Sequence, residues 1–283
     1  MINKDNLTKE LLKSYDKLGL SRSVDFARFP SISKVRSFLE STKDILFPGI
    51  YRSIEKEKNL NDFIQDKVNE VDLALNDLIQ KNLLYKDTLL KEKEVSKHST
   101  KIVSDFFNDI TQIREFLIDD AHAIFNGDPA AKTVEEILMS YVTFQSILVY
   151  RIAHFFYKNE LFLFARMMAE ISHFDTSIDI HPGAKIGRSF CIDHGTGIVI
   201  GETAEIGENV KLYQGVTLGA FSVDKADQDK KRHPTIEDNV TVYAMSTILG
   251  GSTVVGSGSI IGANVWLTKS VPENSKIKLS TIA

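Results

Sequence analysis

The stretch "DIHPGAKIGRSFCIDHGTGIVIGE", residues 179–202, carries an isoleucine at every sixth position. Ile180, Ile186, Ile192 and Ile198 follow this period, which neither an α-helix nor an alternating strand produces. A six-residue period is typical of a parallel β-helix, in which each hexapeptide supplies a short strand and a turn. Three hexapeptides make one triangular coil, and the coils stack about 4.8 Å apart. We therefore expect these isoleucines to point inward and build the core of such a coil.

The period continues beyond this stretch with two interruptions. After a two-residue slip in "GTG" and again after a polar segment, the sequence places inward side chains at Ile200, Ile206, Leu212 and Leu218, and then at Ile236, Val242, Ile248, Val254, Ile260 and Trp266. The polar segment between Leu218 and Ile236 has no aliphatic residue at the required places. We predict that it forms a loop that leaves the coil near residues 220–235.

The front of the chain follows a different pattern. Thirteen of the 16 glycines lie after residue 180, and no proline occurs between Pro48 and Pro129. Apolar residues spaced by three and four over 52–95 predict an amphipathic helix, and a second helical stretch covers 101–125. The fold class is therefore α+β.

The apolar stretch 134–170 predicts one or two buried helices, separated from the preceding helix by "FNGDPAAK" at 125–132. The domains that we predict are an α-helical N-terminal domain over 1–175 and a left-handed β-helix over 176–283.

Composition limits the kind of partner. The chain of 283 residues has a formal charge of -4, and it has no Lys/Arg-rich run of the kind that binds a nucleic-acid phosphate backbone. We therefore expect no nucleic-acid partner. No window approaches the roughly 18 to 20 apolar residues of a membrane span, and the start does not resemble a signal peptide. The single cysteine, Cys191, excludes a disulfide within the chain and is expected to pack in the core. We expect a cytoplasmic protein.

Five motifs add a resemblance to a known family. They are "DPA" at 128–130, "DIHPGAKIG" at 179–187, "DHGTGIVIGETA" at 193–204, "QGVTLG" at 214–219 and "RHP" at 232–234. In this order they resemble the serine O-acetyltransferases among the hexapeptide-repeat acyltransferases. The resemblance implies a β-helix that trimerises, with acetyl-CoA and serine meeting in clefts between subunits. It covers residues 125–270, and the first 120 residues show no motif.

Acetyl transfer to a serine hydroxyl needs a base, because an alcohol is hardly ionised near neutral pH. Histidine suits this role, and a carboxylate on its other nitrogen fixes the tautomer. The resemblance assigns the two roles to His194 and Asp179. No covalent enzyme intermediate is required.

A free amino acid also needs carboxylates for its ammonium group and a cation for its carboxylate. The resemblance assigns Asp128 and Asp193 to the ammonium group, and Arg232 with His233 to the carboxylate.

The resemblance further implies that Gly219, Ala220 and Ala244 line the path of acetyl-CoA, which is a co-substrate rather than a permanently bound cofactor. No metal is expected. The implied partners are L-serine, acetyl-CoA and further copies of the chain, as a trimer or a dimer of trimers, together with O-acetylserine sulfhydrylase.

Simpler interpretations remain for each site residue. An aspartate in a β-helix turn can bond only backbone amides, and Asp128 can cap the helix that follows it. His181, before a proline, is expected to be structural, and the "RHP" pair can belong to a solvated loop.

Three other functions remain as alternatives. The first is an O-acetyltransferase of a sugar, homoserine or another small hydroxyl acceptor, and the second is a non-catalytic structural trimer. The third is a zinc enzyme of the γ-carbonic anhydrase kind, using His181, His194 and His233, although the chain lacks that family's His-x-x-x-x-His pair.

Overall fold

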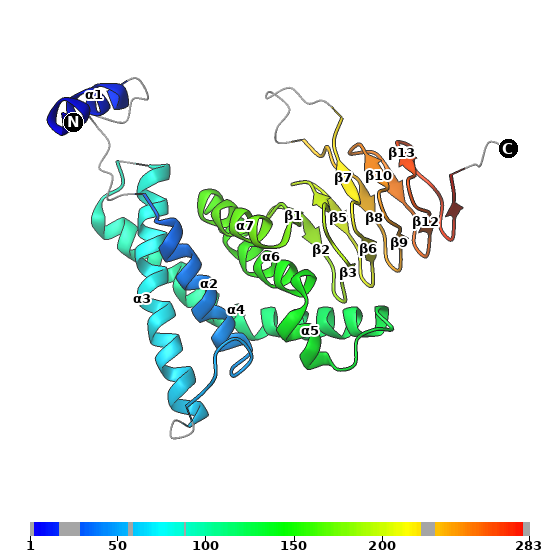
Figure 1. The fold of residues 1–283 in the computed structure, drawn as a ribbon, viewed down its shortest axis with the longest axis horizontal. Helices are drawn as coiled ribbons and strands as arrows, with labels where there is room; N and C mark the ends of the chain where they lie inside the picture. Colours follow the sequence, from blue (N-terminus) through cyan, green and yellow to red (C-terminus); the bar gives the residue numbers. More distant parts are fainter. Residues whose placement is uncertain (1–2, 17–28, 56–58, 88, 222–229, 280–283) are drawn as a thin grey trace.

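The computed structural model describes residues 3–16, 29–55, 59–87, 89–221 and 230–279. Helices form the N-terminal part and short parallel strands the C-terminal part (Figure 1). The helices are α1 (Lys4–Asp16), α2 (Ile32–Leu46), α3 (Leu60–Lys86), α4 (Glu92–Gly127), α5 (Val134–Ser140), α6 (Val142–Lys158) and α7 (Phe162–Thr176). Among these described helices, none is long and apolar enough to cross a lipid bilayer.

The strands are two or three residues long and form three parallel sheets. Sheet A contains β1 (Asp179–Ile180), β4 (Val199–Ile200), β7 (Thr217–Gly219), β10 (Thr247–Leu249) and β13 (Trp266–Leu267). Sheet B contains β2 (Lys185–Ile186), β5 (Glu205–Ile206), β8 (Thr235–Ile236) and β11 (Val254–Val255). Sheet C contains β3 (Cys191–Asp193), β6 (Lys211–Tyr213), β9 (Thr241–Val242), β12 (Ile260–Ile261) and β14 (Lys276–Ile277). The first four coils each take one strand from each sheet, and the fifth takes β13 and β14 with an isolated bridge at Val271 between them. This arrangement confirms the α+β fold with a left-handed β-helix.

The predicted slip at "GTG" is confirmed by the strand register. Ile180 of β1 pairs with Ile200 of β4, so the first coil takes two residues more than three hexapeptides would supply. The additional residues widen the turn after β3. Backbone with positive φ closes this turn, at His194 (59°), Gly195 (85°) and Gly197 (77°). Glycine adopts such angles without strain, which explains its presence at 195 and 197.

The predicted inward positions are wrong after Ile248. Val255 and Ile261 are fully buried, whereas Val254 and Ile260 are the outer members of their strands and Trp266 is 68% exposed. The turn from β10 to β11 holds one additional residue, because Ile248 and Val255 are seven positions apart rather than six. Leu267 therefore replaces Trp266 at the more buried position of β13.

The helical predictions are partly correct. The helix expected over 52–95 is shorter, since α3 begins at Leu60, where the side chain of Asn59 accepts a hydrogen bond from the Asp62 amide. Helix α4 contains the stretch 101–125 and extends it at both ends. Residues 134–170 belong to three helices, α5, α6 and α7, rather than one or two.

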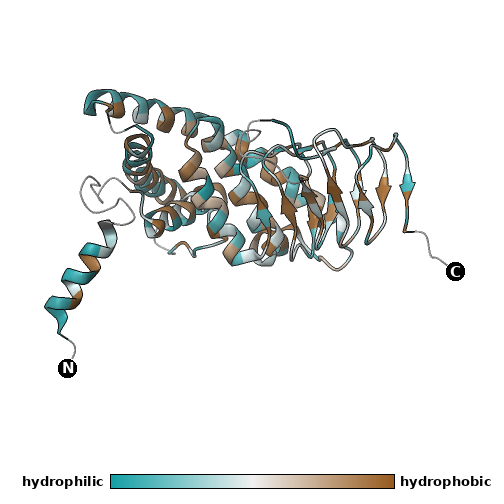
Figure 2. Cartoon of the chain, turned by 90° about the horizontal axis from the view of Figure 1, so that it is seen from above, coloured by the Kyte–Doolittle hydropathy of each residue, from teal (hydrophilic) through white to brown (hydrophobic). Residues whose placement is uncertain are grey.

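One continuous hydrophobic core joins the helices to the first coils. Figure 2 shows the two regions as one elongated body, in which apolar residues line the facing sides of the helices, while α1 stands apart. Helix α7 ends at Thr176 and β1 begins at Asp179. Because the core is shared, the division into domains 1–175 and 176–283 stays a prediction. The loop predicted near 220–235 includes residues 222–229, which lie outside the described residues.

Candidate active site

The predicted site residues divide between two corners of the β-helix. We call the turns that lead from sheet C to sheet A the third corner; they are residues 194–198, 214–216, 243–246 and 262–265. We call the turns that lead from sheet A to sheet B the first corner; their described residues include 181–184, 201–204 and 230–234. Asp193, His194 and Ala244 lie at the third corner, and Arg232 and His233 lie at the first.

His194 directly follows β3, and its imidazole projects into solvent with 71% of the side chain exposed. Its Nε2 lies 3.6 Å from Oδ1 of Asp193. The next residue, Gly195, packs so closely on Ile178 and Thr143 that a Cβ there would approach them to within 3 Å. Helix α6, which carries Thr143, therefore supports the backbone that presents His194.

Asp179 begins β1, beside the same corner. The amide of Gly197 donates to the carbonyl of Ser177, so the backbone before Asp179 lies against the turn that contains His194. Oδ1 of Asp179 lies 3.8 Å from Nη1 of Arg166 in α7. No hydrogen bond or ion pair joins Asp179 to His194 in the described part of the chain. The structure thus brings the two residues to one corner, with the imidazole nearer Asp193.

Asp193 is held by a lysine that the sequence did not indicate. Nζ of Lys211 lies 2.8 Å from Oδ2 of Asp193 and donates to the carbonyl of Gly127 at 2.6 Å. Gly127 is the last residue of α4, where the helix dipole is negative. Burial opposes the charge of Lys211, but the hydrogen bond to Asp193 raises its pKa above the ordinary value. Lys211 therefore ties β6 to both Asp193 and the end of α4.

Asp128 follows Gly127 and is held at both oxygens. Oδ2 accepts a hydrogen bond from the Tyr141 hydroxyl at 2.7 Å, and Oδ1 accepts one from the amide of Ala130 at 2.8 Å. These two bonds lower the pKa of Asp128, so the carboxylate is charged near neutral pH. Thr133 caps the following helix α5, so Asp128 does not have that role. Asp193 thus pairs with Lys211, and Asp128 directly follows the Gly127 carbonyl that the same ammonium group bonds.

Arg232 and His233 lie at the first corner on the return from the segment outside the described residues. Nη2 of Arg232 donates to Oε2 of Glu202 in an ion pair. The backbone amides of Arg232 and His233 both donate to the hydroxyl of Thr203, at 2.9 and 3.1 Å. Glu202 and Thr203 therefore fix this pair of residues in place, and neither was predicted as a site residue.

The imidazole of His233 is buried, with 8% of the residue exposed, and covers Gly201. Burial, helped by the charge of Arg232, lowers its pKa to about 4, so the ring is neutral near pH 7. Nδ1 accepts a hydrogen bond from the Thr203 amide at 3.1 Å, which places the ring proton on Nε2. His233 can therefore offer a ligand an N–H donor rather than a charge.

The residues predicted for acetyl-CoA lie at both corners. Ala244 belongs to the third corner, where its carbonyl accepts from the Asn264 amide of the next turn. Gly219 ends β7 on the side of the first corner, Ala220 follows it, and both are partly exposed. A Cβ on Gly219 would lie 2.8 Å from the end of the Leu249 side chain in the next coil, which would have to shift.

Two residues that we expected to be structural have structural contacts. Cys191 is buried, and burial raises the pKa of its thiol to about 12, so it is not a thiolate near neutral pH. Nδ1 of His181 accepts from the amide of Gly183 within its own turn. Among the described residues, no group of three or more His, Cys, Asp or Glu is arranged to hold a metal ion.

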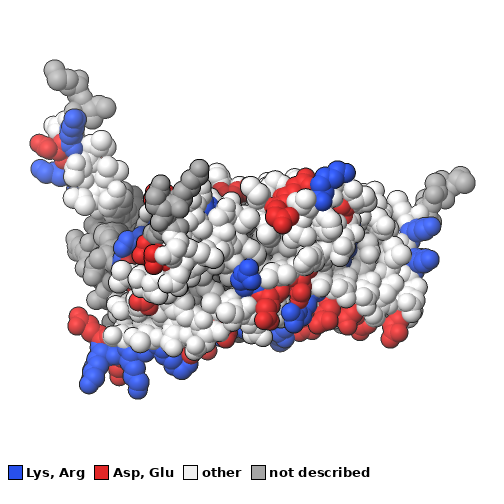
Figure 3. Space-filling model, turned by 90° about the horizontal axis from the view of Figure 1, so that it is seen from below, with Lys and Arg blue, Asp and Glu red and all other residues white. Residues whose placement is uncertain are grey.

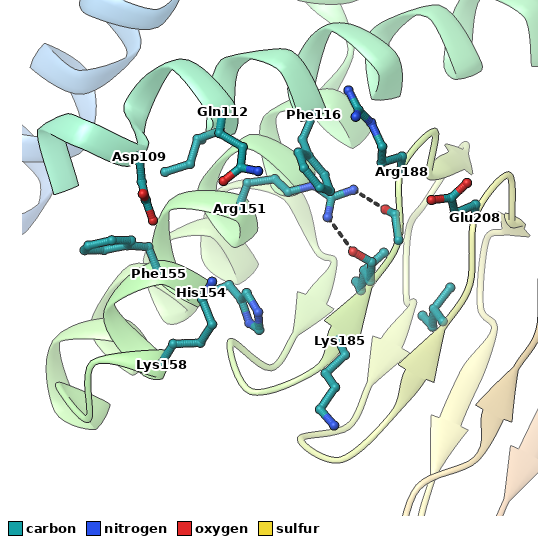
Figure 4. Close-up of a pocket in the computed structure, with 14 residues that line it drawn as sticks. Asp109, Gln112, Phe116, Arg151, His154, Phe155, Lys158, Lys185, Arg188 and Glu208 are labelled. Atoms are coloured by element: carbon teal, nitrogen blue, oxygen red, sulfur yellow. Dashed lines mark hydrogen bonds between the residues drawn. The ribbon is translucent and has the colours of Figure 1, made fainter. Parts of the chain in front are cut away.

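A pocket also lies away from the predicted site residues. A cavity of about 510 Å³ lies between α4, α6 and the first coil, lined by Phe116, Arg151, His154 and Lys158 among others (Figure 4). It contains none of the predicted site residues. On the face shown in Figure 3, acidic and basic side chains are interspersed among uncharged residues.

Comparison with known proteins gives relatives that are serine acetyltransferases. A plasmid-encoded serine acetyltransferase of Synechococcus elongatus is 40% identical over 271 residues, which span 92% of this chain and 85% of that protein. The serine acetyltransferase of Bacillus licheniformis is 48% identical over 136 residues, 48% of this chain and 61% of that protein. No protein-family model matches the chain.

Solved structures agree with these relatives. Serine acetyltransferase 1 of Entamoeba histolytica in complex with L-cysteine superposes with a TM-score of 0.75 at 31% identity and covers 98% of this chain and 100% of its own. The Neisseria gonorrhoeae serine acetyltransferase in complex with serine gives a TM-score of 0.56 at 26% identity, over 86% of this chain and 93% of its own.

A parallel β-helix of hexapeptide strands with an exposed imidazole at one corner defines the class of hexapeptide-repeat acyltransferases. Within this class, the identity to the Synechococcus protein extends over most of both chains. The chain belongs to the serine acetyltransferase family.

Proposed function

We propose that the protein transfers the acetyl group of acetyl-CoA to the hydroxyl of L-serine, giving O-acetyl-L-serine and CoA in cysteine biosynthesis. The observation that carries this proposal is the third corner, where an exposed imidazole lies beside the largely buried carboxylate of Asp193. Lys211 links Asp193 to the Gly127 carbonyl, which directly precedes Asp128. Two carboxylates suit the ammonium group of an amino acid, whereas a sugar acceptor would not require them. The relatives that bind serine and L-cysteine support the same class of ligand.

In the proposed reaction His194 removes the proton of the serine hydroxyl as the oxygen attacks the thioester carbonyl. The carbon–sulfur bond then breaks and the CoA thiolate leaves, taking a proton. Asp179 is the proposed carboxylate that orients the imidazole and stabilises its charge. Because His194 is exposed, its side chain can turn from Asp193 toward Asp179 when the ammonium group of serine is bound by Asp128 and Asp193.

Serine binding requires both corners in this proposal. Asp128 and Asp193 hold the ammonium group at the third corner, and Arg232 with the N–H of His233 holds the carboxylate. The two corners lie at opposite edges of sheet A within one chain, so we propose that the third corner of one subunit meets the first corner of the next in a homotrimer. Exposed apolar side chains at sheet A and its third corner, Val199, Met245 and Trp266, support this assembly.

Acetyl-CoA would lie in the same cleft, with Ala244 of one subunit and Gly219 and Ala220 of the next along its path. No metal or permanently bound cofactor takes part in the proposed steps. We also propose a cytoplasmic location, for which the buried, reduced Cys191 is the support. Pairing of trimers and a complex with O-acetylserine sulfhydrylase stay predictions of the resemblance.

A thiol-release assay tests the proposed function. The purified protein is incubated with acetyl-CoA and with serine, homoserine or a galactoside, and free CoA is measured. We expect turnover with serine to exceed that with the other acceptors by at least about tenfold, since Asp128, Asp193 and Arg232 select an α-amino acid of this size. Acetylation of the galactoside without turnover of serine would refute the proposal.

A further inference from the structure

A chain of hydrogen bonds leads from the helical region to Arg232. The hydroxyl of Tyr157 in α6 donates to Oε1 of Glu202 at 2.5 Å. The other oxygen of this carboxylate, Oε2, accepts from Nη2 of Arg232. Tyr157 and Arg232 are 75 positions apart in the sequence, and Glu202 connects them at the first corner. The position of the guanidinium group thus depends on a residue of α6.

One side of α6 holds the first coil. The Tyr150 hydroxyl donates to the carbonyl of Ala184, and Nδ1 of His154 lies 2.8 Å from the carbonyl of Pro182. Arg151 donates to two backbone carbonyls of the first coil, as Figure 4 shows. Tyr157 follows Tyr150 by seven positions, so it lies on the same side of the helix. These contacts hold α6 rigidly against the coil, and they place the Tyr157 hydroxyl at a fixed point.

Tyr157 differs from the other three residues in its partner. They bond backbone carbonyls of the first coil, and Arg151 also pairs with the buried Asp120. Tyr157 instead bonds the carboxylate that itself holds Arg232. The ring is fixed on two sides, by Phe162 at 4.9 Å and His181 at 5.6 Å between centroids. The ring contacts thus place the hydroxyl, and the hydroxyl in turn holds the carboxylate of Glu202.

The hydroxyl limits how Glu202 can pair with Arg232. A carboxylate and a guanidinium prefer a fork of two parallel hydrogen bonds, which uses two nitrogens of the arginine. Here Oε1 of Glu202 accepts from Tyr157 and Oε2 accepts from Arg232. Loss of the hydroxyl would let the carboxylate turn and pair with Arg232 through both oxygens. The guanidinium would then turn with the carboxylate and lose the orientation in which it meets a ligand carboxylate.

We propose that Tyr157 is a positioning residue for the amino-acid substrate: through Glu202 it keeps Arg232 oriented to bind the carboxylate of serine. This inference rests on the proposed function, in which Arg232 has that role. It assigns a part of substrate recognition to the helical region, since Tyr157 lies in α6 and acts through Glu202.

The test compares two acceptors, serine and serine methyl ester, which lacks the carboxylate charge. In Tyr157→Phe we expect the KM for serine to rise about five- to twentyfold, as for a weakened charged hydrogen bond. The kcat for serine, the KM for acetyl-CoA and the kcat/KM for the ester should stay within about twofold. In a Glu202→Ala background the same substitution should have no further effect on the KM for serine, because the two residues act in series.

Tyr150→Phe is the matched control. It removes the hydroxyl of another α6 tyrosine, one that bonds a backbone carbonyl. We expect it to lower the melting temperature and to leave the preference for serine over the ester unchanged. If Tyr157→Phe behaves in the same way, the positioning role is refuted.

Arg232→Gln separates this inference from the proposed function. If Arg232→Gln abolishes the preference for serine over the ester but Tyr157→Phe does not reduce it, the role of Tyr157 is wrong and that of Arg232 stands. If Arg232→Gln leaves the preference intact, both roles are wrong. A reduced preference in both variants supports the inference.

Discussion

The ammonium group of Lys211 lies 2.8 Å from Oδ2 of Asp193, and both side chains are largely buried. The same ammonium group donates to the carbonyl of Gly127, at the end of the 36-residue helix α4. Asp128 begins directly after this carbonyl. Lys211 therefore links Asp193 to the backbone directly before Asp128, and it joins the helical region to the β-helix.

We expect Lys211→Met to destabilise the protein by about 1 to 3 kcal/mol, because it leaves a buried carboxylate and a helix-terminal carbonyl without this donor. Methionine keeps most of the length of the side chain, so loss of packing is small. Urea unfolding at a fixed protomer concentration measures the change in the free energy of unfolding.

Lys185→Met is the control for this prediction. Its ion pair with Glu205 is exposed, with 74% of the lysine side chain accessible, and should contribute less than about 1 kcal/mol. Equal losses in the two variants would show that burial of the Lys211–Asp193 pair has no special effect.

His194→Asn tests the proposed base without straining the backbone. His194 has a φ of 59°, and asparagine adopts this left-handed conformation readily. Because the side chain is exposed, we expect an unchanged melting temperature. The kcat should fall about 100- to 10,000-fold, the contribution of general base catalysis. A variant that keeps the kcat of the unsubstituted enzyme would refute the assignment.

The six-residue period predicted most of the β-helix, because each inward side chain is set by the local geometry of a coil. The prediction became wrong after Ile248, where aliphatic pairs such as Val254 with Val255 and Ile260 with Ile261 make two registers equally apolar. Only the length of the turn before Val254 decides between them. That length depends on a corner whose close packing involves residues distant in sequence, such as Gly251 against Lys231.

Some site residues could likewise be predicted from local sequence, and others could not. His194, Asp193 and Arg232 stand in recognisable motifs, so the sequence alone singled them out. Lys211 occupies an ordinary outward position of a strand, and Tyr157 an ordinary position of a helix. Their roles depend on how α4 and α6 pack against the coils, which no local pattern in the chain records.

Burial of His233 predicts a dependence of stability on pH. Its pKa is about 4 in the folded protein and near the ordinary 6.5 in the unfolded chain. Between these values only the unfolded chain binds the proton, so the free energy of unfolding falls as the pH is lowered. The contribution of His233 is about 2 kcal/mol between pH 7 and pH 5. Burial of His154 and His181 acts in the same direction.

Urea unfolding of the unsubstituted protein and of His233→Gln at pH 7, 6 and 5 measures this contribution. Glutamine does not titrate, so the loss of stability on acidification should be smaller in the variant. Parallel curves for the two proteins would show that His233 is protonated in the folded state as readily as in the unfolded chain.

The proposed trimer predicts a different response to charge on two sheets. Val199 lies in β4 of sheet A with 39% exposed, and Ile260 lies in β12 of sheet C with 37% exposed. An aspartate at 199 would be desolvated between subunits, whereas one at 260 would remain in water. We expect the unsubstituted protein and Ile260→Asp to sediment as three copies of the 31.8 kDa chain. Val199→Asp should dissociate and lose activity, because each site needs both corners. A trimeric, active Val199→Asp would place the interface elsewhere.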